Sequence, residues 1–465
     1  VGGSLGNWKS ISNYANIDYG YANRYFVSLS AALDGSSRFG SEANGVNLGK
    51  HVFGLFPSVN GAWLISAEDF MKDQQLFDVL KLRAGYSITG NDDIGNYSSR
   101  YYYVSQGLLG AYGLLRGNIP NAGLKWETNK KAVIGVDASL LKERLNISLD
   151  VYNSKTKDLI SVKELSTISG FGYAIMNDGS LQNNGIDLNI SGRIIDRKNL
   201  KWDASLNISA YKNTLLSLST DEELHTIAGG VVRTKVGAPV AQFYGYQTDG
   251  ILNSTDEATE ANLKIKNPYG VEYAFNAGDV KFVDNEKDGI INEADMTVIG
   301  DPNPDFFGSI VNGIQYKRFS LNTIFTFMVG NDVYNALRAN LESMNGLDNQ
   351  TNAIVGRWKY DGQQTTTPKA TWGDPMGNAR FSDRWIEDGS YLRLKSLTLS
   401  YELPLKTGFI NSAQVYVTGN NLLTFTNYLG YDPEFSISQS PIYAGIDTGV
   451  SPQPRTVLLG VKIGL

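Results

Sequence analysis

The sequence predicts an all-β fold, and within that class a transmembrane antiparallel β-barrel of which this chain supplies a part. Apolar and polar residues alternate along paired segments, as they do in β-strands. The second face of these segments is rich in acidic and amide side chains, which suits a barrel with lipid outside and a wet lumen inside. No run of apolar residues approaches the roughly 18 that a transmembrane helix needs, so strands are the remaining way to span a bilayer.

Residues 126–160 show the alternation most clearly, because they read as one hairpin. One face of the first arm collects Ala132, Ile134, Val136, Ala138 and Leu140. The other face collects Lys131, Gly135, Asp137 and Ser139. After a tight turn at 141–144, the second arm sets Leu145, Ile147, Leu149 and Val151 against Asn146, Ser148, Asp150 and Tyr152. A soluble β-sandwich also alternates, with its apolar face inward, so the repetition of long strands along the chain is what favours the barrel.

Period-two alternation predicts the strands in chain order. They are expected at 25–33, 56–66, 80–87, 185–194, 201–211, 306–316, 319–329, 391–403 and 456–465. Pro404 stops the strand 391–403, and the short turn that follows fits the periplasmic side of a barrel.

The segments between these strands are predicted to be loops of several kinds. A helical turn is expected at 67–77 and a loop helix at 331–345, because their apolar residues recur at helical spacing. Residues 215–230, which include His225, are polar and are expected to be irregular. Residues 242–305 form an insertion and are the least barrel-like part of the chain.

The composition excludes several kinds of functional site and partner. The chain has 465 residues with 49 Gly, 26 Tyr, 19 Phe, 7 Trp and no Cys, and its net charge is −6. Without cysteine it has no disulfide, no thiol nucleophile and no cysteine-ligated metal. The acidic balance, without a basic stripe among aromatic residues, argues against a nucleic-acid partner. Residues 1–8 lack the basic start and apolar middle of a signal peptide.

Short motifs follow one another along almost the whole chain. They are Asp34–Gly40, the spacing of Phe56-Pro57-Ser58 to Trp63, Leu80–Arg83 with Thr89–Asn91, Leu124–Glu127, Asn184–Ile186, Gly300–Phe306, Arg380–Arg384, Glu387–Lys395 and Pro452–Thr456. In their residues and in their order these motifs resemble the SusC/RagA-type TonB-dependent outer-membrane transporters of Bacteroidetes.

The resemblance implies a closed barrel of about 22 strands that is preceded by a plug domain and a segment that binds TonB. This chain offers roughly a dozen spans, counted as strands of about ten residues plus loops. We therefore expect residues 1–465 to be the C-terminal portion of the barrel. Because an open sheet edge is not tolerated in lipid, the plug and the remaining barrel strands are expected to be supplied in addition to this chain.

The resemblance also implies a function in the outer membrane of a Gram-negative cell, in contact with its lipid. Such transporters import oligosaccharides or oligopeptides into the periplasm, with a SusD-like surface lipoprotein that caps the barrel and with TonB acting through the plug. Two alternatives stay open at this point. One is a passive porin or adhesin barrel, and the other is a calcium-stabilised secreted β-protein that binds glycans.

An acidic loop within residues 242–305 predicts a bound Ca²⁺. Counted as an EF-hand-type loop, its candidate ligands are Asp284, Glu286, Asp288, Ile290 through its carbonyl, Asn292 and Asp295, with Gly289 at the sharp turn. Calcium prefers oxygen ligands that converge within one turn of chain, and this spacing provides them. The extended flanks argue for a structural metal rather than a helix-loop-helix sensor. The alternative is a solvated acidic loop.

Catalysis has little support, so the chain is not expected to be an enzyme and no catalytic residue is assigned. His51 and His225 lie in separate polar segments without a nucleophile motif. The adjacent acids Glu387 and Asp388 are expected to be solvated. Four aromatic residues are candidates for stacking on a sugar or peptide, although barrel girdles equally explain them. They are Trp372, Trp385, Tyr391 and Tyr431.

Overall fold

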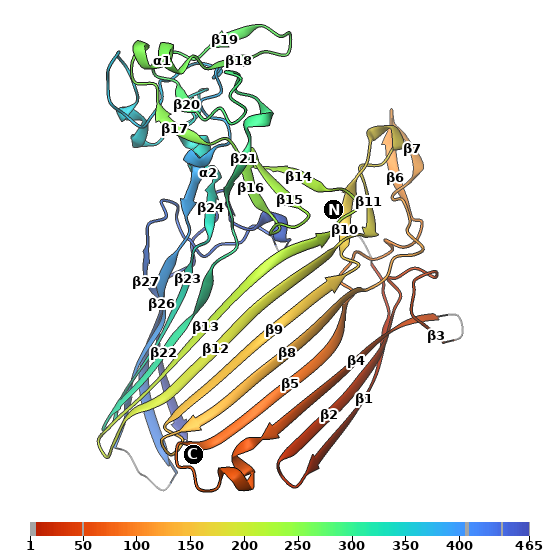
Figure 1. Ribbon diagram of the computed structural model, residues 1–465, viewed down its shortest axis with the longest axis vertical. Helices are drawn as coiled ribbons and strands as arrows, with labels where there is room; N and C mark the ends of the chain where they lie inside the picture. Colours follow the sequence, from red (N-terminus) through yellow and green to blue (C-terminus); the bar gives the residue numbers. More distant parts are fainter. Residues whose placement is uncertain (1–5, 49–50, 405–408, 439, 465) are drawn as a thin grey trace. The chain divides into compact units, whose positions relative to one another are not determined.

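The computed structural model describes residues 6–48, 51–404, 409–438 and 440–464. It divides into two compact units, which we describe separately. Unit 1 comprises residues 1–197, 201–221 and 236–238, and unit 2 comprises residues 198–200, 222–235 and 239–465. Both units are built mainly from β-strands (Figure 1). Among the described residues, no helix has the length and apolar character needed to cross a membrane.

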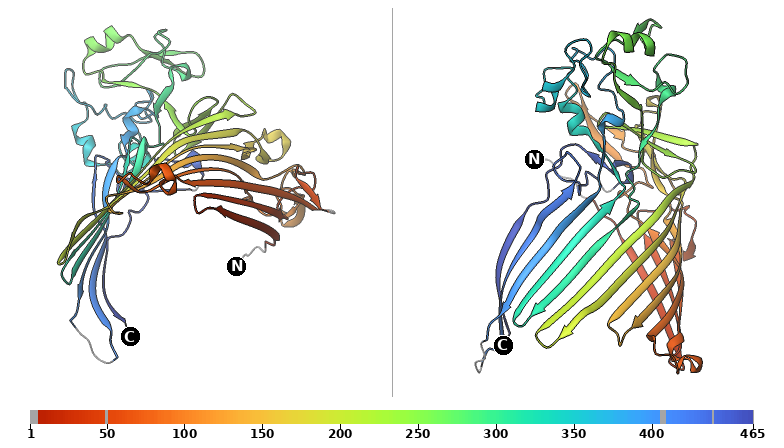
Figure 2. Two further views of the ribbon diagram at one scale, coloured as in Figure 1. Left: turned by 60° about the horizontal axis from the view of Figure 1, so that its bottom comes forward. Right: turned by 60° about the vertical axis from the view of Figure 1, so that its left-hand side comes forward.

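Unit 1 is organised around long strands that lie side by side in chain order (Figure 2). They are β1 (Ser10–Tyr21), β2 (Tyr25–Ser36), β4 (His51–Leu64), β5 (Phe77–Asn91), β8 (Glu127–Leu140), β9 (Leu145–Lys157), β12 (Ser180–Arg197) and β13 (Leu200–Ser217). The pairs from β1 to β12 are antiparallel. The predicted hairpin at 126–160 is confirmed, because Ile134 pairs with Val151 and Val136 with Leu149.

The connections of unit 1 differ between the two ends of the sheet. At one end the chain turns quickly, for example through Leu141, Lys142 and Glu143, whose φ angles are 60°, 60° and 59°. A longer connection, residues 65–76, contains two short 3-10 helices, η1 (Ile65–Ala67) and η2 (Asp69–Met71), where a helical turn was predicted. At the other end lie β3 (Val46–Leu48) and the hairpins β6–β7 (Tyr103–Leu108, Ala111–Arg116) and β10–β11 (Ile160–Glu164, Tyr173–Asn177).

Unit 2 contains a second series of long antiparallel strands. They are β22 (Phe306–Tyr316), β23 (Phe319–Val329), β26 (Tyr391–Glu402), β27 (Ser412–Thr426) and β29 (Thr456–Gly464). The predicted hairpin at 306–329 is confirmed, with its turn at Lys317 and Arg318. The register shifts between Ile324 and Phe325, which marks a bulge that period-two alternation did not predict. The last residue of the predicted strand 456–465, Leu465, lies outside the described residues.

Short elements of unit 2 form what we call the loop layer. They are β14 (Glu222–Ile227), β15 (Gly230–Lys235), β16 (Gln242–Gly245), β17 (Thr248–Ile251), α1 (Thr255–Ala261), β18 (Lys264–Lys266), β19 (Glu272–Ala274), β20 (Val280–Phe282), η4 (Glu293–Asp295), β21 (Thr297–Gly300), β24 (Asp332–Asn335), α2 (Ala336–Leu341), η5 (Asn352–Gly356), η6 (Asp383–Trp385), β25 (Ile386–Asp388), η7 (Pro441–Tyr443) and β28 (Ile446–Asp447). One hydrophobic core gathers around Phe243, Tyr334 and Trp385, and a second around Leu252 and Val280.

Two predictions about the loop layer were wrong in detail. Residues 215–230 were expected to be irregular, but β14 pairs with β15 in register from Glu222 with Lys235 to Ile227 with Gly230. The helix expected at 331–345 is limited to α2, because Asp332–Asn335 instead pairs as β24 with β25 and β28. At β24, pairing with strands distant in the sequence overrides the local pattern, whereas β14 and β15 form a local hairpin whose strands the polar composition concealed.

Candidate functional site: the polar face and the acidic loop

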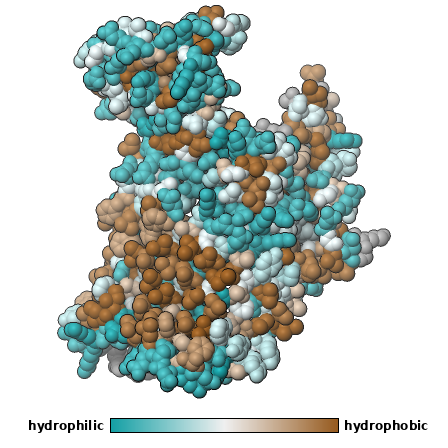
Figure 3. Space-filling view, in the orientation of Figure 1, coloured by the Kyte–Doolittle hydropathy of each residue, from teal (hydrophilic) through white to brown (hydrophobic). Residues whose placement is uncertain are grey.

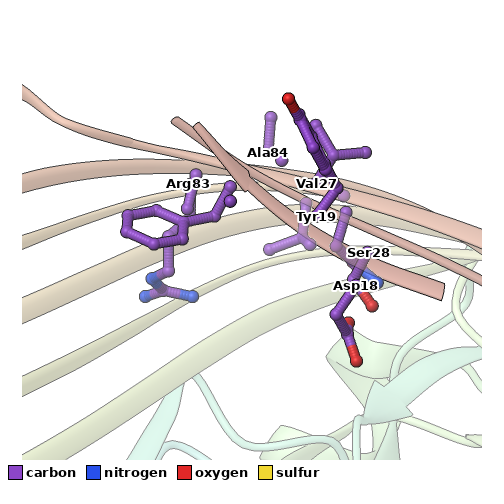
Figure 4. Close-up of a pocket in the computed structure, with 13 residues that line it drawn as sticks. Asp18, Tyr19, Val27, Ser28, Arg83 and Ala84 are labelled. Atoms are coloured by element: carbon purple, nitrogen blue, oxygen red, sulfur yellow. The ribbon is translucent and has the colours of Figure 1, made fainter. Parts of the chain in front are cut away.

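The sheet of unit 1 has an apolar face and a polar face. Cross-strand partners keep the apolar face continuous from Ile17 through Leu29 and Val59 to Tyr86. One residue further along each strand, the pairs Asp18 with Ser28 and Ser28 with Asn60 make the polar face. Figure 4 shows this division directly, since Tyr19, Val27 and Ala84 project to one side of the strands and Asp18, Ser28 and Arg83 to the other.

A charged group occupies the polar face. The Arg83 guanidinium donates through Nε to Asp137 Oδ2 at 2.8 Å and through Nη2 to Asp150 Oδ2 at 3.0 Å. Lys81 Nζ lies 3.6 Å from Asp137 Oδ2. Asp187 stands directly opposite Asp150 across the β9–β12 pair, so three carboxylates face two cations here. Like charges opposite each other cost stability, and the pairing of Arg83 and Lys81 with Asp137 and Asp150 offsets that cost.

Amide and hydroxyl side chains extend the polar face. Asn129 Nδ2 donates to Ser154 Oγ and to Thr156 Oγ1, both at 2.8 Å. Asn213 Nδ2 donates to Asn183 Oδ1 at 2.7 Å. These side chains present donors and acceptors of both kinds, as expected for the wall of a wet lumen.

The apolar side chains of the strands stay exposed to the surroundings of the protein. Ile134 is 62% exposed although it is a large aliphatic residue in the centre of a strand. In Figure 3, hydrophobic side chains gather over the long strands and hydrophilic side chains cover their lower ends. A broad exposed apolar surface of this kind needs an apolar environment, because water would not tolerate it.

The predicted calcium loop is held together by its own carboxylates. Asp284 Oδ1 accepts from Lys287 N at 2.6 Å, and its Oδ2 accepts from Gly289 N at 2.7 Å. Asp295 is fully buried, and its Oδ1 accepts from Asn285 N at 2.9 Å while its Oδ2 accepts from Asn292 N, also at 2.9 Å. The first and last carboxylates of the loop therefore fix its backbone.

The other candidate ligands have separate partners. Asp288 Oδ1 accepts from Ile290 N at 2.7 Å, and the Ile290 carbonyl accepts from Asn292 Nδ2 at 3.1 Å. Glu286 contributes its amide to Asp295 Oδ1 at 3.3 Å. Among the described residues, no three histidine, aspartate or glutamate side chains converge as a metal site would require. The loop is therefore pre-folded around Asp284 and Asp295, and calcium binding stays a prediction.

The four aromatic candidates separate into two pairs. Trp385 and Tyr391 are buried, and Trp385 packs in the core with Phe243. The guanidinium groups of Arg338 and Arg384 lie 5.2 and 4.8 Å from the Trp385 ring. Trp372 and Tyr431 are exposed. The buried pair serves packing, which leaves Trp372 and Tyr431 as the candidates that a solute can reach.

Sequence reasoning missed a buried polar network that ties the loop layer together. Glu387, which was expected to be solvated, accepts from Arg338 Nε at 2.6 Å and from Leu429 N at 2.9 Å. The Tyr428 hydroxyl donates to Asp447 Oδ2 at 2.6 Å, and burial together with this bond raises the pKa of Tyr428. Burial lowers the pKa of Arg384 to about 10. The sequence feature that could have indicated this network is the cluster of charges in Glu387–Lys395, which is one of the motifs that resemble SusC/RagA-type transporters.

The two histidines lie in different units of the chain. His225 lies in β14, where its Nε2 is 3.7 Å from Glu223 Oε2. His51 begins β4, far along the chain and in the other unit.

Comparisons with known proteins agree with this geometry. A family model described as TonB dependent receptor-like, β-barrel matches residues 5–422. The TonB-dependent receptor P3 of Formosa agariphila is 32% identical over 481 residues, which cover 99% of this chain and 46% of that protein. The TonB-dependent receptor SusC of Bacteroides thetaiotaomicron is 27% identical over 480 residues, which cover 97% of this chain and 43% of that protein.

Solved structures are similar over nearly the whole chain. The structure of the RagAB peptide transporter matches with a TM-score of 0.82 and 25% identity, covering 98% of this chain and 47% of that one. The RagAB peptide importer in its open-open state matches with a TM-score of 0.79 and 26% identity, at the same coverage. The chain thus spans about half the length of the relatives that it matches.

Proposed function

Because the chain belongs to the TonB-dependent receptor β-barrel family and lies in the outer membrane, we propose that it forms the larger part of the barrel wall of a SusC/RagA-like nutrient importer. The observation that carries this proposal is the two-faced sheet of unit 1. Its apolar face suits lipid, and its polar face, with Arg83 between Asp137 and Asp150, suits a lumen that a polar solute crosses.

The importer as a whole would require components beyond these residues. We propose a plug domain and further barrel strands, TonB acting on the plug, and a SusD-like surface lipoprotein at the outer mouth. The solute would be an oligopeptide or an oligosaccharide. The structural relative RagAB is a peptide transporter, which supports an oligopeptide, and the similarity to SusC keeps an oligosaccharide open.

Uptake by the living cell tests this proposal. A strain that depends on this protein should lose growth on its nutrient when either the protein or TonB is deleted, because an importer of this kind needs energy from the inner membrane. A passive porin, the alternative on the same scaffold, would sustain growth without TonB. An adhesin would leave growth unchanged in both deletions.

We further propose that the loop at Asp284–Asp295 binds calcium as a structural metal that stabilises the loop layer. The support is that Asp284 and Asp295 already hold the loop closed and that all six candidate oxygens lie within it. The variant Asp288→Asn removes charge from a side chain whose single hydrogen bond, to Ile290 N, an amide oxygen can also accept. Calcium should then protect the loop layer of the parent from proteolysis more than that of the variant. Equal protection in calcium and in chelator would refute the metal.

A further inference from the structure

The connection between β4 and β5 is unlike the other turns at its end of the sheet. Residues 65–76 contain the helices η1 and η2, whereas β1 is joined to β2 by residues 22–24 and β8 to β9 by residues 141–144. Short turns mark the periplasmic end of such a barrel. The longer connection therefore lies at the periplasmic end, where it has the length to fold back over one face of the sheet.

Hydrogen bonds show which face this connection covers. Glu68 accepts from the Tyr25 hydroxyl at 2.6 Å, from Trp63 Nε1 at 2.9 Å and from Arg24 Nη1 at 2.9 Å. Tyr25 and Trp63 are cross-strand partners, and Trp63 pairs in turn with Leu82, which pairs with Val136 on the apolar face. The carboxylate of Glu68 is therefore held on the apolar side of the sheet.

The aromatic residues that donate hydrogen bonds to Glu68 belong to an aromatic row at the edge of the apolar face. Tyr21 and Tyr25 stack with their ring centroids 6.4 Å apart, and Tyr25 and Trp63 stack at the same distance. Tyrosine and tryptophan at such a position lie where the lipid chains give way to headgroups. The connection is thus continuous with the lipid-facing surface.

Apolar side chains of the connection are left uncovered by the described residues of this chain. Phe70 in η2 is 69% exposed and Leu76 is 58% exposed. Opposite charges flank Phe70, since Lys72 Nζ lies 2.7 Å from Asp69 Oδ1, which Arg24 Nη2 also approaches to 3.5 Å, and the Lys72 and Asp69 side chains are exposed. An exposed ion pair of this kind contributes little by itself and is easily exchanged for other partners.

We propose that residues 65–76 form an interfacial anchor that inserts Phe70 and Leu76 into the periplasmic leaflet, at the boundary between headgroups and acyl chains. The partner is a surface of zwitterionic phospholipid. Its phosphate matches the Lys72 ammonium and its headgroup ammonium matches the Asp69 carboxylate. Glu68 orients the anchor by fixing it to Tyr25 and Trp63. An amphipathic segment with its apolar side in the acyl boundary and its charges at the headgroups is the arrangement that interfacial binding favours.

Site-directed spin labelling tests the anchor: residues 1–465 contain no cysteine, and any cysteine elsewhere in the full-length protein is first replaced by serine, so that the labels are specific. The full-length protein would carry a nitroxide at Leu76→Cys, in vesicles of phosphatidylethanolamine with some phosphatidylglycerol. The matched control is a nitroxide at Leu109→Cys, because Leu109 is also an exposed leucine but lies between β6 and β7, at the other end of the sheet. We expect the label at 76 to collide mainly with oxygen, and the label at 109 mainly with a water-soluble nickel complex.

Two outcomes would overturn the anchor. Nickel accessibility at position 76 equal to that at 109 would place the segment in water. Low accessibility to both reagents would mean that a protein covers it. Both labelled variants must first show the heat-dependent gel mobility of the parent, so that misfolding is not mistaken for exposure.

A second substitution separates insertion from mere proximity to lipid. With the label at 76, Phe70→Asp should raise nickel accessibility several-fold, whereas Phe70→Leu should leave it near the parent value. Unchanged accessibility in Phe70→Asp would refute the role of Phe70. None of these measurements depends on transport, so a failure here leaves the proposed import function untouched.

Discussion

The long strands of unit 1 and the loop layer of unit 2 bury their side chains in opposite ways. On the apolar face of unit 1, Ile134, Val136 and Val151 are exposed by 62, 37 and 53%, and in β8 the single buried position is Gly135. In the loop layer, by contrast, Phe243, Leu252 and Val280 are fully buried in short elements. The difference shows that each region is built for its own solvent. The strands gain from lipid contact and continuous backbone pairing, whereas the loop layer must exclude water from cores of its own.

The largest expected effect is on the loop layer. Phe243→Ala should cost about 3–5 kcal/mol of local stability, because Phe243 is fully buried between Tyr334 and Phe381 and the cavity would not refill. Hydrogen exchange of the loop layer in the intact protein would measure it. Tyr269→Ala, at an exposed position of the same layer, is the control and should change little. A small effect at Phe243 would mean that this core does not resemble that of a soluble domain.

A charge on the apolar face should destabilise the barrel, whereas a charge at an exposed position of a soluble protein usually changes stability little. Ile134→Lys at an exposed position should destabilise the barrel by roughly 2–4 kcal/mol in lipid vesicles, because a charge near the bilayer centre loses its hydration. Denaturant unfolding in vesicles would measure it. Val133→Lys, one residue away on the polar face, should cost much less. Equal costs at 133 and 134 would contradict the assignment of the two faces.

A buried hydrogen bond in the loop layer should have an intermediate effect. Tyr428→Phe removes the donor to Asp447 Oδ2, and Asp447 is itself buried while its Oδ1 accepts from Gly449 N and Val450 N. Leaving that oxygen unpartnered should cost roughly 1–3 kcal/mol, read from proteolysis of residues 428–450. Tyr431→Phe, at an exposed tyrosine, should be neutral.

The smallest expected effect is a pH dependence of the connection 65–76, caused by ionisation of Glu68. The hydrogen bonds from Tyr25 and Trp63 hold the pKa of Glu68 below its ordinary value of 4.5. A lowered pKa in the folded state means that the ionised carboxylate stabilises the connection above the ordinary pKa and that this contribution is lost as pH falls through the folded value. The accessibility of a label at Leu76→Cys to the water-soluble nickel complex should therefore rise in acid. In Glu68→Gln it should be independent of pH, and an unchanged pH profile in that variant would show that another group is responsible.

Much of the fold could be predicted from the sequence, because side chains on a β-strand alternate between its two faces and the sequence therefore alternates between apolar and polar residues. The faces of β8 and β9, the hairpin at 306–329 and the acidic loop at 284–295 all follow from local order. The limits of the strands were less predictable. β12 and β13 run from Ser180 to Arg197 and from Leu200 to Ser217, well beyond the segments expected, because polar strand ends pair as well as apolar centres do.

The sequence by itself determined that this chain makes two-faced strands for a membrane, since alternation of side chains across a pleated backbone needs no distant contact. Tertiary structure decided what depends on distant partners. Trp385 is buried and Trp372 is exposed because segments around Phe243 and Ile446 close over the first and not over the second. Glu68 likewise acquires its place from Tyr25, 43 residues away. Packing and hydrogen bonding between segments that are remote in the sequence produce no local periodicity. They can therefore be recognised only in the folded structure.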